Sequence, residues 1–193
     1  LSEEQIINKA RELHKQGNIS EATTYYQHLI NEGCNDHRIF SNYGVILKDL
    51  GKLEEAEILT RKAIEINPDF AEAYHNLSLI ELLKGNYKSG LKNYEYRFKI
   101  KPAVILHGKP TLKRIDYKQI EKEEKLLVVS EQAPGDIILF MRYLLPLKKL
   151  GVRLSFSAPQ KLHSLIQDSG IHSNPISPEE CSRFKEGKWI PLL

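Results

Sequence analysis

The sequence predicts an α-helical solenoid of three helix–turn–helix repeats, followed by a partial α/β segment built on a parallel sheet. Three glycines spaced by 34 residues, Gly17, Gly51 and Gly85, each end one amphipathic helical pattern shortly before the next begins. After residue 125 the helical period gives way to a short, uninterrupted apolar run, which is typical of a buried strand. We therefore expect two structural parts in the 193-residue chain.

Alignment on the glycines divides residues 3–104 into the units 3–36, 37–70 and 71–104. Small residues recur in the same register, where two helices must approach closely: Ala10, Gly44 and Ser78 in the first helix of each unit, and Ala22, Ala56 and Gly90 in the second. With this period and these positions, residues 3–102 resemble tetratricopeptide repeats. The resemblance implies a curved array that holds a protein or peptide in its concave groove.

The third unit departs from the repeat pattern at its end. A small residue is expected three positions after Tyr94, but Arg97 stands there and Phe98 follows. We expect this helix to cap the array or to dock against another fold, because the last repeat must cover its open face. No glycine follows at the next repeat position, which holds Gln119, so the array is predicted to stop after three units.

Composition excludes several classes of protein. The net charge of +3 is too small to argue for nucleic-acid binding. The longest apolar stretches are too short to span a membrane, and no secretory signal precedes the first helix, so we expect a cytoplasmic protein with reduced cysteines. The histidines and cysteines have no metal-ligand spacing, so no metal is assigned. The chain starts at Leu1 rather than methionine, which predicts a fragment.

Residues 105–124 are predicted to form a connector, with a short helix around residues 117–124. Its basic residues could contact phosphate, but acidic residues lie among them, so a solvated linker is the simpler interpretation. Residues 125–193 then alternate between strand and helix patterns. Strands are expected at 126–130, 152–157 and 188–193, and helices at 137–150 and 161–169.

Several short blocks in the second part resemble a known family. These blocks are Tyr94-Glu95-Tyr96-Arg97-Phe98, Glu131-Gln132-Ala133-Pro134-Gly135-Asp136, Arg142-Tyr143-Leu144 and Ile190-Pro191-Leu192-Leu193. They are similar to bacterial proteins in which tetratricopeptide repeats precede a two-lobed, heptosyltransferase-like glycosyltransferase domain. The resemblance covers only the first, Rossmann-like lobe of such a domain. It implies no nucleotide-sugar cofactor for this chain unless a complete donor lobe exists.

Heptosyltransferases use the aspartate of the matching segment as the proposed general base, which corresponds to Asp136. The alternative is that Asp136 caps its helix, because aspartate accepts hydrogen bonds from the free amides at a helix start. Glu131, Gln132, Gly135 and Arg142 are candidates for the lining of the same cleft.

Asparagines also repeat every 34 residues, as Asn8, Asn42 and Asn76. In the O-linked N-acetylglucosamine transferase family, a similar ladder holds the backbone of bound peptides, since an amide offers both donors and an acceptor. The alternative is that these asparagines satisfy neighbouring backbone groups. Further polar candidates for the groove are Arg11, Arg38, Lys48 and His75.

Two further features limit the prediction. Chaperone-binding relatives hold a terminal carboxylate with basic residues at the positions of Ile7 and Glu72, which are not basic here. Leu79, Leu82 and Leu83 are predicted to be a core face or the place where the second part docks. The sequence thus favours a protein- or peptide-binding module. A glycosyltransferase acting on protein or polysaccharide, or a structural remnant, remains the alternative, and the oligomeric state is not predicted.

Overall fold

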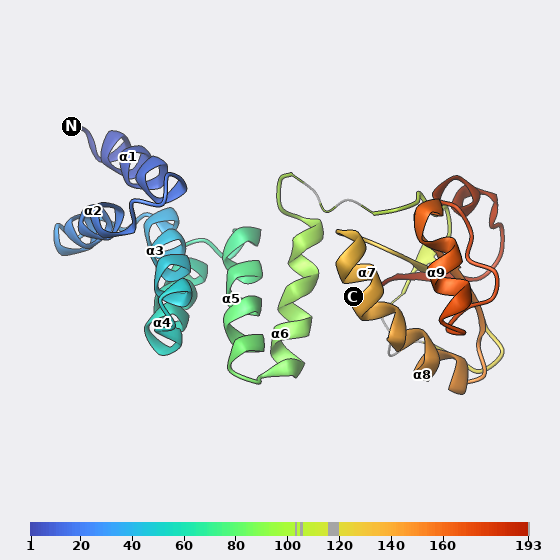
Figure 1. Cartoon of the computed structure of the whole chain (residues 1–193). Helices are drawn as coiled ribbons and strands as arrows, with labels where there is room; N and C mark the ends of the chain where they lie inside the picture. Colours follow the sequence, from blue (N-terminus) through green and yellow to red (C-terminus); the bar gives the residue numbers. More distant parts are fainter. Residues whose placement is uncertain (103, 105, 116–119, 193) are drawn as a thin grey trace. The chain divides into compact units, whose positions relative to one another are not determined.

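Antiparallel helix pairs follow one another along the first of two units in the computed structural model, which describes residues 1–102, 104, 106–115 and 120–192. The first unit covers residues 1–103 and the second residues 104–193, and we describe each by itself (Figure 1). In the first unit the pairs are α1 (Glu3–Lys15) with α2 (Ile19–Asn31), α3 (His37–Asp49) with α4 (Leu53–Ile66), and α5 (Ala71–Leu83) with α6 (Tyr87–Tyr94).

The glycines of the 34-residue period end the first helix of every pair. Gly17, Gly51 and Gly85 have φ angles of 79°, 77° and 80°, in the left-handed region that glycine adopts without a steric penalty. The amide of Gly51 donates to the carbonyl of Lys48, and the amide of Lys52 donates to that of Leu47. This pair of bonds is the Schellman motif, and it turns the chain into α4.

The small residues of the repeat lie where paired helices touch. Ala10, Gly44 and Ser78 are buried, as the sequence predicts. The contact is tightest at Gly44, where a methyl group would lie 2.5 Å from Thr60 Oγ1 and 3.2 Å from the carbonyl oxygen of Ala56. Thr60 cannot easily move away, because it is buried and its hydroxyl donates to that same carbonyl at 2.7 Å.

Gly44→Ala should therefore lower the free energy of unfolding by about 1–3 kcal/mol, although alanine alone favours a helix by about 1 kcal/mol. Urea unfolding followed by circular dichroism measures this change. The same substitution in a Thr60→Ala background should be close to neutral, because the clashing hydroxyl is gone. A stabilising effect of Gly44→Ala in the wild-type chain would contradict the close contact.

The last helix of the first unit changes its winding where the sequence loses the repeat pattern. Helix α6 ends at Tyr94 and continues as the 3₁₀ turn η1 (Glu95–Phe98). Arg97 in this turn is 1% exposed, and the equivalent positions of the earlier units hold the buried residues Leu29 and Ala63. The guanidinium stacks on the rings of Tyr94 and Phe98, with 4.4 and 4.1 Å to their centroids. A long cation thus fills a site that the earlier repeats fill with apolar groups.

The second unit is built on a small parallel sheet with strand order β1-β4-β2-β3. The strands are β1 (Lys113–Arg114), β2 (Lys125–Val129), β3 (Arg153–Ser157) and β4 (Lys188–Pro191), and every pairing is parallel. Strand β2 is buried along most of its length, which agrees with its continuous apolar sequence. The other elements among the described residues are α7 (Pro134–Phe140), η3 (Met141–Tyr143), α8 (Leu144–Lys149), η4 (Gln160–Leu162), α9 (His163–Asp168) and η5 (Pro178–Arg183).

Different elements pack against the two faces of the sheet. On one face, Leu126, Val128 and Phe156 pack against side chains of α7, η3, α8 and α9, such as Ile137 and Ile166. On the other face the described cover consists of loop residues and η5. That second cluster contains Leu127, Val129, Cys181 and Trp189, with Leu106, Leu112, Ile176 and Phe184 packed against it. Among the described elements, helices thus cover one face of the sheet, whereas a doubly wound fold has helices on both.

Residues 106–115, predicted as part of a connector, belong to the second unit. Lys113 and Arg114 pair with Lys188 and Trp189 of β4, and Ile115 is 6% exposed in the core. The sequence does not reveal β1 because two residues are too few for a period. The helix expected around residues 117–124 falls partly outside the described residues, and the helix expected at 137–150 is divided into α7, η3 and α8.

Candidate functional site

The first helices of the three pairs form the candidate binding surface. Helix α1 contacts α3, and α3 contacts α5, so equivalent positions of the repeats lie on neighbouring helices. We call the surface that carries the predicted groove residues the A-helix face. These residues are Asn8, Arg11, Arg38, Asn42, Lys48, His75 and Asn76.

The three asparagines of the ladder have different surroundings. Asn8 donates to Glu4 Oε1 at 3.2 Å on the exposed surface, whereas Asn76 donates to Oγ of the buried Ser41 at 3.0 Å. Asn42 lies by the hydroxyl of Tyr26, whose pKa burial raises to about 12, while the amide of Asn42 and the positive charge of Arg11 act in the opposite direction. The ladder is therefore not uniform: Asn76 braces the helix next to it, and Asn42 borders a buried phenol.

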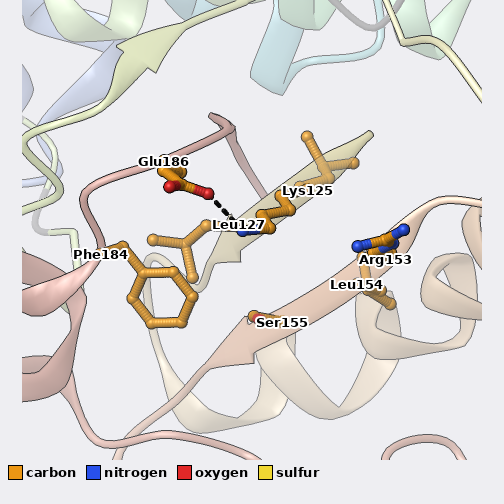
Figure 2. A pocket seen from close by; sticks show the side chains of 8 residues that line it. Lys125, Leu127, Arg153, Leu154, Ser155, Phe184 and Glu186 are labelled. Atoms are coloured by element: carbon orange, nitrogen blue, oxygen red, sulfur yellow. Dashed lines mark hydrogen bonds and ion pairs between the residues drawn. The ribbon is translucent and has the colours of Figure 1, made fainter. Parts of the chain in front are cut away.

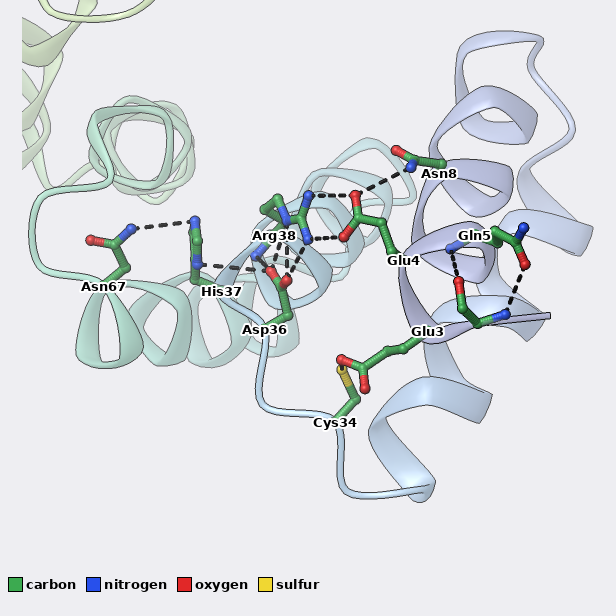
Figure 3. A network of polar contacts seen from close by, with 10 residues as sticks. Glu3, Glu4, Gln5, Asn8, Cys34, Asp36, His37, Arg38 and Asn67 are labelled. Atoms are coloured by element: carbon green, nitrogen blue, oxygen red, sulfur yellow. Dashed lines mark hydrogen bonds and ion pairs between the residues drawn. The ribbon is translucent and has the colours of Figure 1, made fainter.

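Arg38 joins the first two repeats through a polar network (Figure 3). Its guanidinium donates to both oxygens of Glu4, at 3.0 and 2.6 Å, and also contacts the carboxylate of Asp36. Asp36 in turn accepts from the backbone amide of Arg38 at 2.8 Å and caps α3. The network continues through His37, whose ring contacts Asn67 at 3.3 Å. Because Arg38 of the second repeat forms ion pairs with Glu4 of the first and with Asp36, it links the two repeats.

Lys48 and His75 lie on the second half of the surface. The ammonium of Lys48 forms an ion pair with Asp49 at 2.6 Å, and the Lys48 side chain is 18% exposed. The ring of His75 lies 5.7 Å from that of Tyr94. Burial lowers the pKa of His75, and the positive charges of Arg97 and Lys48 lower it further, so the folded chain disfavours protonation of His75.

Aromatic residues that sequence reasoning did not assign to the site lie beside it. Tyr74 of α5 stacks on Tyr96 of η1, with ring centroids 4.1 Å apart and planes within 9°. The ammonium of Lys99 lies over the ring of Tyr96, 4.5 Å from its centroid. The irregular end of the third unit was the only signal for this cluster, because Tyr96 belongs to a turn that the repeat pattern does not contain.

The low pKa of His75 predicts a loss of stability in mild acid. The unfolded chain binds a proton near the ordinary histidine pKa of about 6.5, whereas the folded chain resists protonation. The free energy of unfolding should therefore decrease as the pH falls from about 7.5 to about 5.5. The pKa values of His14, His107 and His172 are also lowered by burial and act in the same direction.

Urea midpoints across this pH range measure the effect. His75→Gln should have a shallower dependence on pH than the wild-type chain. An identical pH dependence of the two proteins would show that His75 does not contribute to the loss of stability in acid.

The loop after β2 contains the candidate residues of the second unit. Asp136 Oδ2 accepts from the amide of Ala133 at 3.3 Å, which is the geometry of a residue that caps the start of α7. Glu131 is 2% exposed, and Gln132 has φ of 65°, in the region that non-glycine residues seldom occupy. Gly135 lies exposed in the first turn of α7.

Arg142 lies in η3, and its guanidinium covers the ring of Tyr143 at 5.1 Å. The predicted leucines of the third unit separate in the structure: Leu82 packs closely on Gly90 of α6, whereas Leu83 is 64% exposed. In the part of the chain that the structure describes, no cluster of histidine, cysteine and acidic residues could hold a metal ion. Among the same residues, no helix combines the length and apolar character needed to cross a membrane.

Comparisons with known proteins match the first unit. Residues 37–70 and residues 59–92 each match a family described as tetratricopeptide repeat. A curated relative, U-box domain-containing protein 70 of Oryza sativa subsp. japonica, is 30% identical over 95 residues, which are 49% of this chain and 12% of that protein. The chain thus spans about an eighth of that relative.

Solved structures that match the chain include three with TM-scores below 0.5. The TPR2B domain of yeast Sti1 in its pHsp70 complex is 26% identical, with a TM-score of 0.45 and coverage of 48% of this chain and 74% of that one. The second TPR of Spaghetti (RPAP3), bound to the HSP90 peptide SRMEEVD, is 17% identical, with a TM-score of 0.45 and coverage of 48% of this chain and 85% of that one. The Arabidopsis OM64 TPR domain is 18% identical, with a TM-score of 0.47 and coverage of 51% of this chain and 82% of that one. Residues 37–92, which contain helix pairs and glycine turns, are therefore similar to tetratricopeptide repeats in both sequence and local structure.

Proposed function

We propose that the A-helix face binds an extended segment of a partner protein. The observation that carries this proposal is the register of the repeats. The amide of Asn42 on α3 and the charge of Arg11 on α1 both act on the hydroxyl of Tyr26, and the charge of Lys48 on α3 acts on His75 of α5. The side-chain amide of Asn42 can both donate hydrogen bonds to a peptide backbone and accept them from it. Such bonds do not depend on the side chains of the peptide.

The charges favour an internal peptide segment with acidic side chains. Arg11 has no ion-pair partner among the described residues, so its charge remains available to a ligand. At the positions where chaperone-binding relatives hold a terminal carboxylate, Ile7 is buried and Glu72 is exposed and acidic. A free C-terminus would meet a like charge at Glu72, and the segment is therefore expected to bind through its middle.

Selection of a random peptide library on the full chain, followed by calorimetry with the selected peptides, tests the proposal. Asn42→Ala should weaken binding about threefold to tenfold, the effect of one or two lost hydrogen bonds. Asn31→Ala is the matched control, because Asn31 is an exposed asparagine at the end of α2. Equal affinity of the two variants would assign Asn42 to structure alone.

A second candidate is that the chain belongs to a longer glycosyltransferase-like protein, with the donor site in another part. It is favoured by the parallel sheet and by the loop at 130–136, which follows β2 and contains the left-handed Gln132. Asp136 would be the base in that protein. We expect this chain by itself to give no saturable heat with uridine or guanosine diphosphate sugars in calorimetry, and tight binding would overturn that expectation.

A further inference from the structure

A cavity of about 300 Å³ opens in the second unit beside the first residues of β2 and β3 (Figure 2). Its volume is at the lower end of small-molecule sites. It lies at the amino ends of the strands, whereas the loop at 130–136 follows the carboxyl end of β2, so the cavity is separate from the predicted cleft. Its lining includes Lys125, Leu127, Arg153, Ser155, Phe184 and Glu186.

Two cations stand side by side at this cavity. Lys125 of β2 pairs in register with Arg153 of β3, so the side chains leave the same face of the sheet on neighbouring strands. Like charges in this position repel each other. The carboxylate of Glu186 forms an ion pair with Lys125, as Figure 2 shows, but no carboxylate among the described residues forms an ion pair with Arg153. One positive charge therefore remains without an acidic partner at the cavity.

Part of the cavity lining is apolar. Leu127, 1% exposed, pairs in register with Ser155 two residues further along the strands than the two cations. The ring of Phe184 lies next to Leu127 and belongs to the same apolar cluster (Figure 2). Ser155 adds a half-buried hydroxyl group. The cavity thus has a cationic edge, an aromatic and aliphatic wall, and one group able to donate or accept a hydrogen bond.

We propose that this cavity binds a small organic acid with a flat apolar body. The acid group lies against Arg153, the cation that Glu186 leaves unpaired, and accepts charge-assisted hydrogen bonds from its guanidinium. The apolar body covers Leu127 and Phe184. Neither part of such a ligand suffices alone, because inorganic anions leave the apolar wall open to water and neutral aromatic molecules leave the charge of Arg153 without a partner.

Amide NMR of the full chain with naphthalene-2-sulfonate tests this proposal. We expect saturable shifts at residues 125–127 and 153–155, with binding at least about tenfold weaker for both 2-naphthol and inorganic sulfate. The proposal is overturned by shifts that centre elsewhere, by equal binding of sulfate or 2-naphthol, or by no saturation up to about 10 mM.

Variants separate the site from nonspecific binding. Arg153→Gln should weaken binding of naphthalene-2-sulfonate about tenfold. Arg183→Gln is the matched control, because Arg183 is an exposed arginine of the same unit that does not line the cavity, and its affinity should equal that of the wild-type chain. Ser155→Leu should abolish binding by filling the space. Equal affinities of the two arginine variants would refute the role of the cationic edge.

Discussion

Arg97→Ala is expected to lower the free energy of unfolding of the first unit by about 3–5 kcal/mol. The substitution removes a large, fully buried side chain and its stacking on Tyr94 and Phe98. It also removes hydrogen bonds from Nη1 to the carbonyl of Tyr94, at 3.0 Å, and to Glu95, at 2.9 Å. Because these contacts hold η1 against α6, urea unfolding should show both a lower midpoint and a loss of helical signal.

Arg97→Met is the control that separates volume from charge. Methionine has a similar length, and apolar replacements of buried ionic groups are often tolerated. The equivalent position of the first unit holds Leu29, a buried apolar residue of similar bulk to methionine. We therefore expect Arg97→Met to be much less destabilising than Arg97→Ala. A small effect of Arg97→Ala itself would show that η1 does not depend on this side chain.

Gly187→Ala is expected to destabilise the second unit by about 3–5 kcal/mol. Gly187 has φ of 101°, where residues with a side chain are strained. A methyl group there would overlap the carbonyl oxygen of Lys125 and lie 2.8 Å from its Cβ atom. Since the carbonyl belongs to the backbone of β2, relief requires that β4 and β2 separate at their start.

Gly170→Ala isolates the part of this cost that comes from the backbone angle. Gly170 also has positive φ, at 70°, but a methyl group there would meet nothing within 4 Å. We expect this substitution to cost about 1–2 kcal/mol, the usual penalty of the left-handed region. Thermal unfolding of both variants gives the comparison, and equal losses of stability would contradict the clash with β2.

The fold of the first unit could be predicted from the sequence because its determinants are local and repeated. Gly51 ends a helix through its own backbone conformation, and Gly44 marks a close helix contact, so a period in the sequence reports both. In the second unit, β2 was predicted from its apolar run and β3 from the alternation of residues 152–157. The connector could not be predicted, because β1 is two residues long and Ile115 is buried only through contacts distant in sequence.

The candidate site, like the fold, could be predicted from the sequence only in part. The register of Asn42 and Arg11 follows from the period, but the role of Arg38 depends on which residue lies beside it. Glu4 and Arg38 occupy the same repeat position, 34 residues apart and with opposite charges. Comparison of charges between equivalent positions would have predicted this link. The glycosyltransferase resemblance stays a prediction, and the bond from Ala133 to Asp136 agrees with the capping alternative.

The most direct test of the account is amide NMR of the full chain with a library-selected peptide at saturation. If the A-helix face is the binding surface, the largest shifts will fall on α1, α3 and α5, around Arg11, Asn42 and His75, with little change in α2, α4 and the sheet. Shifts that concentrate on α2 and α4, or on the second unit, would contradict the proposal that this face holds the partner.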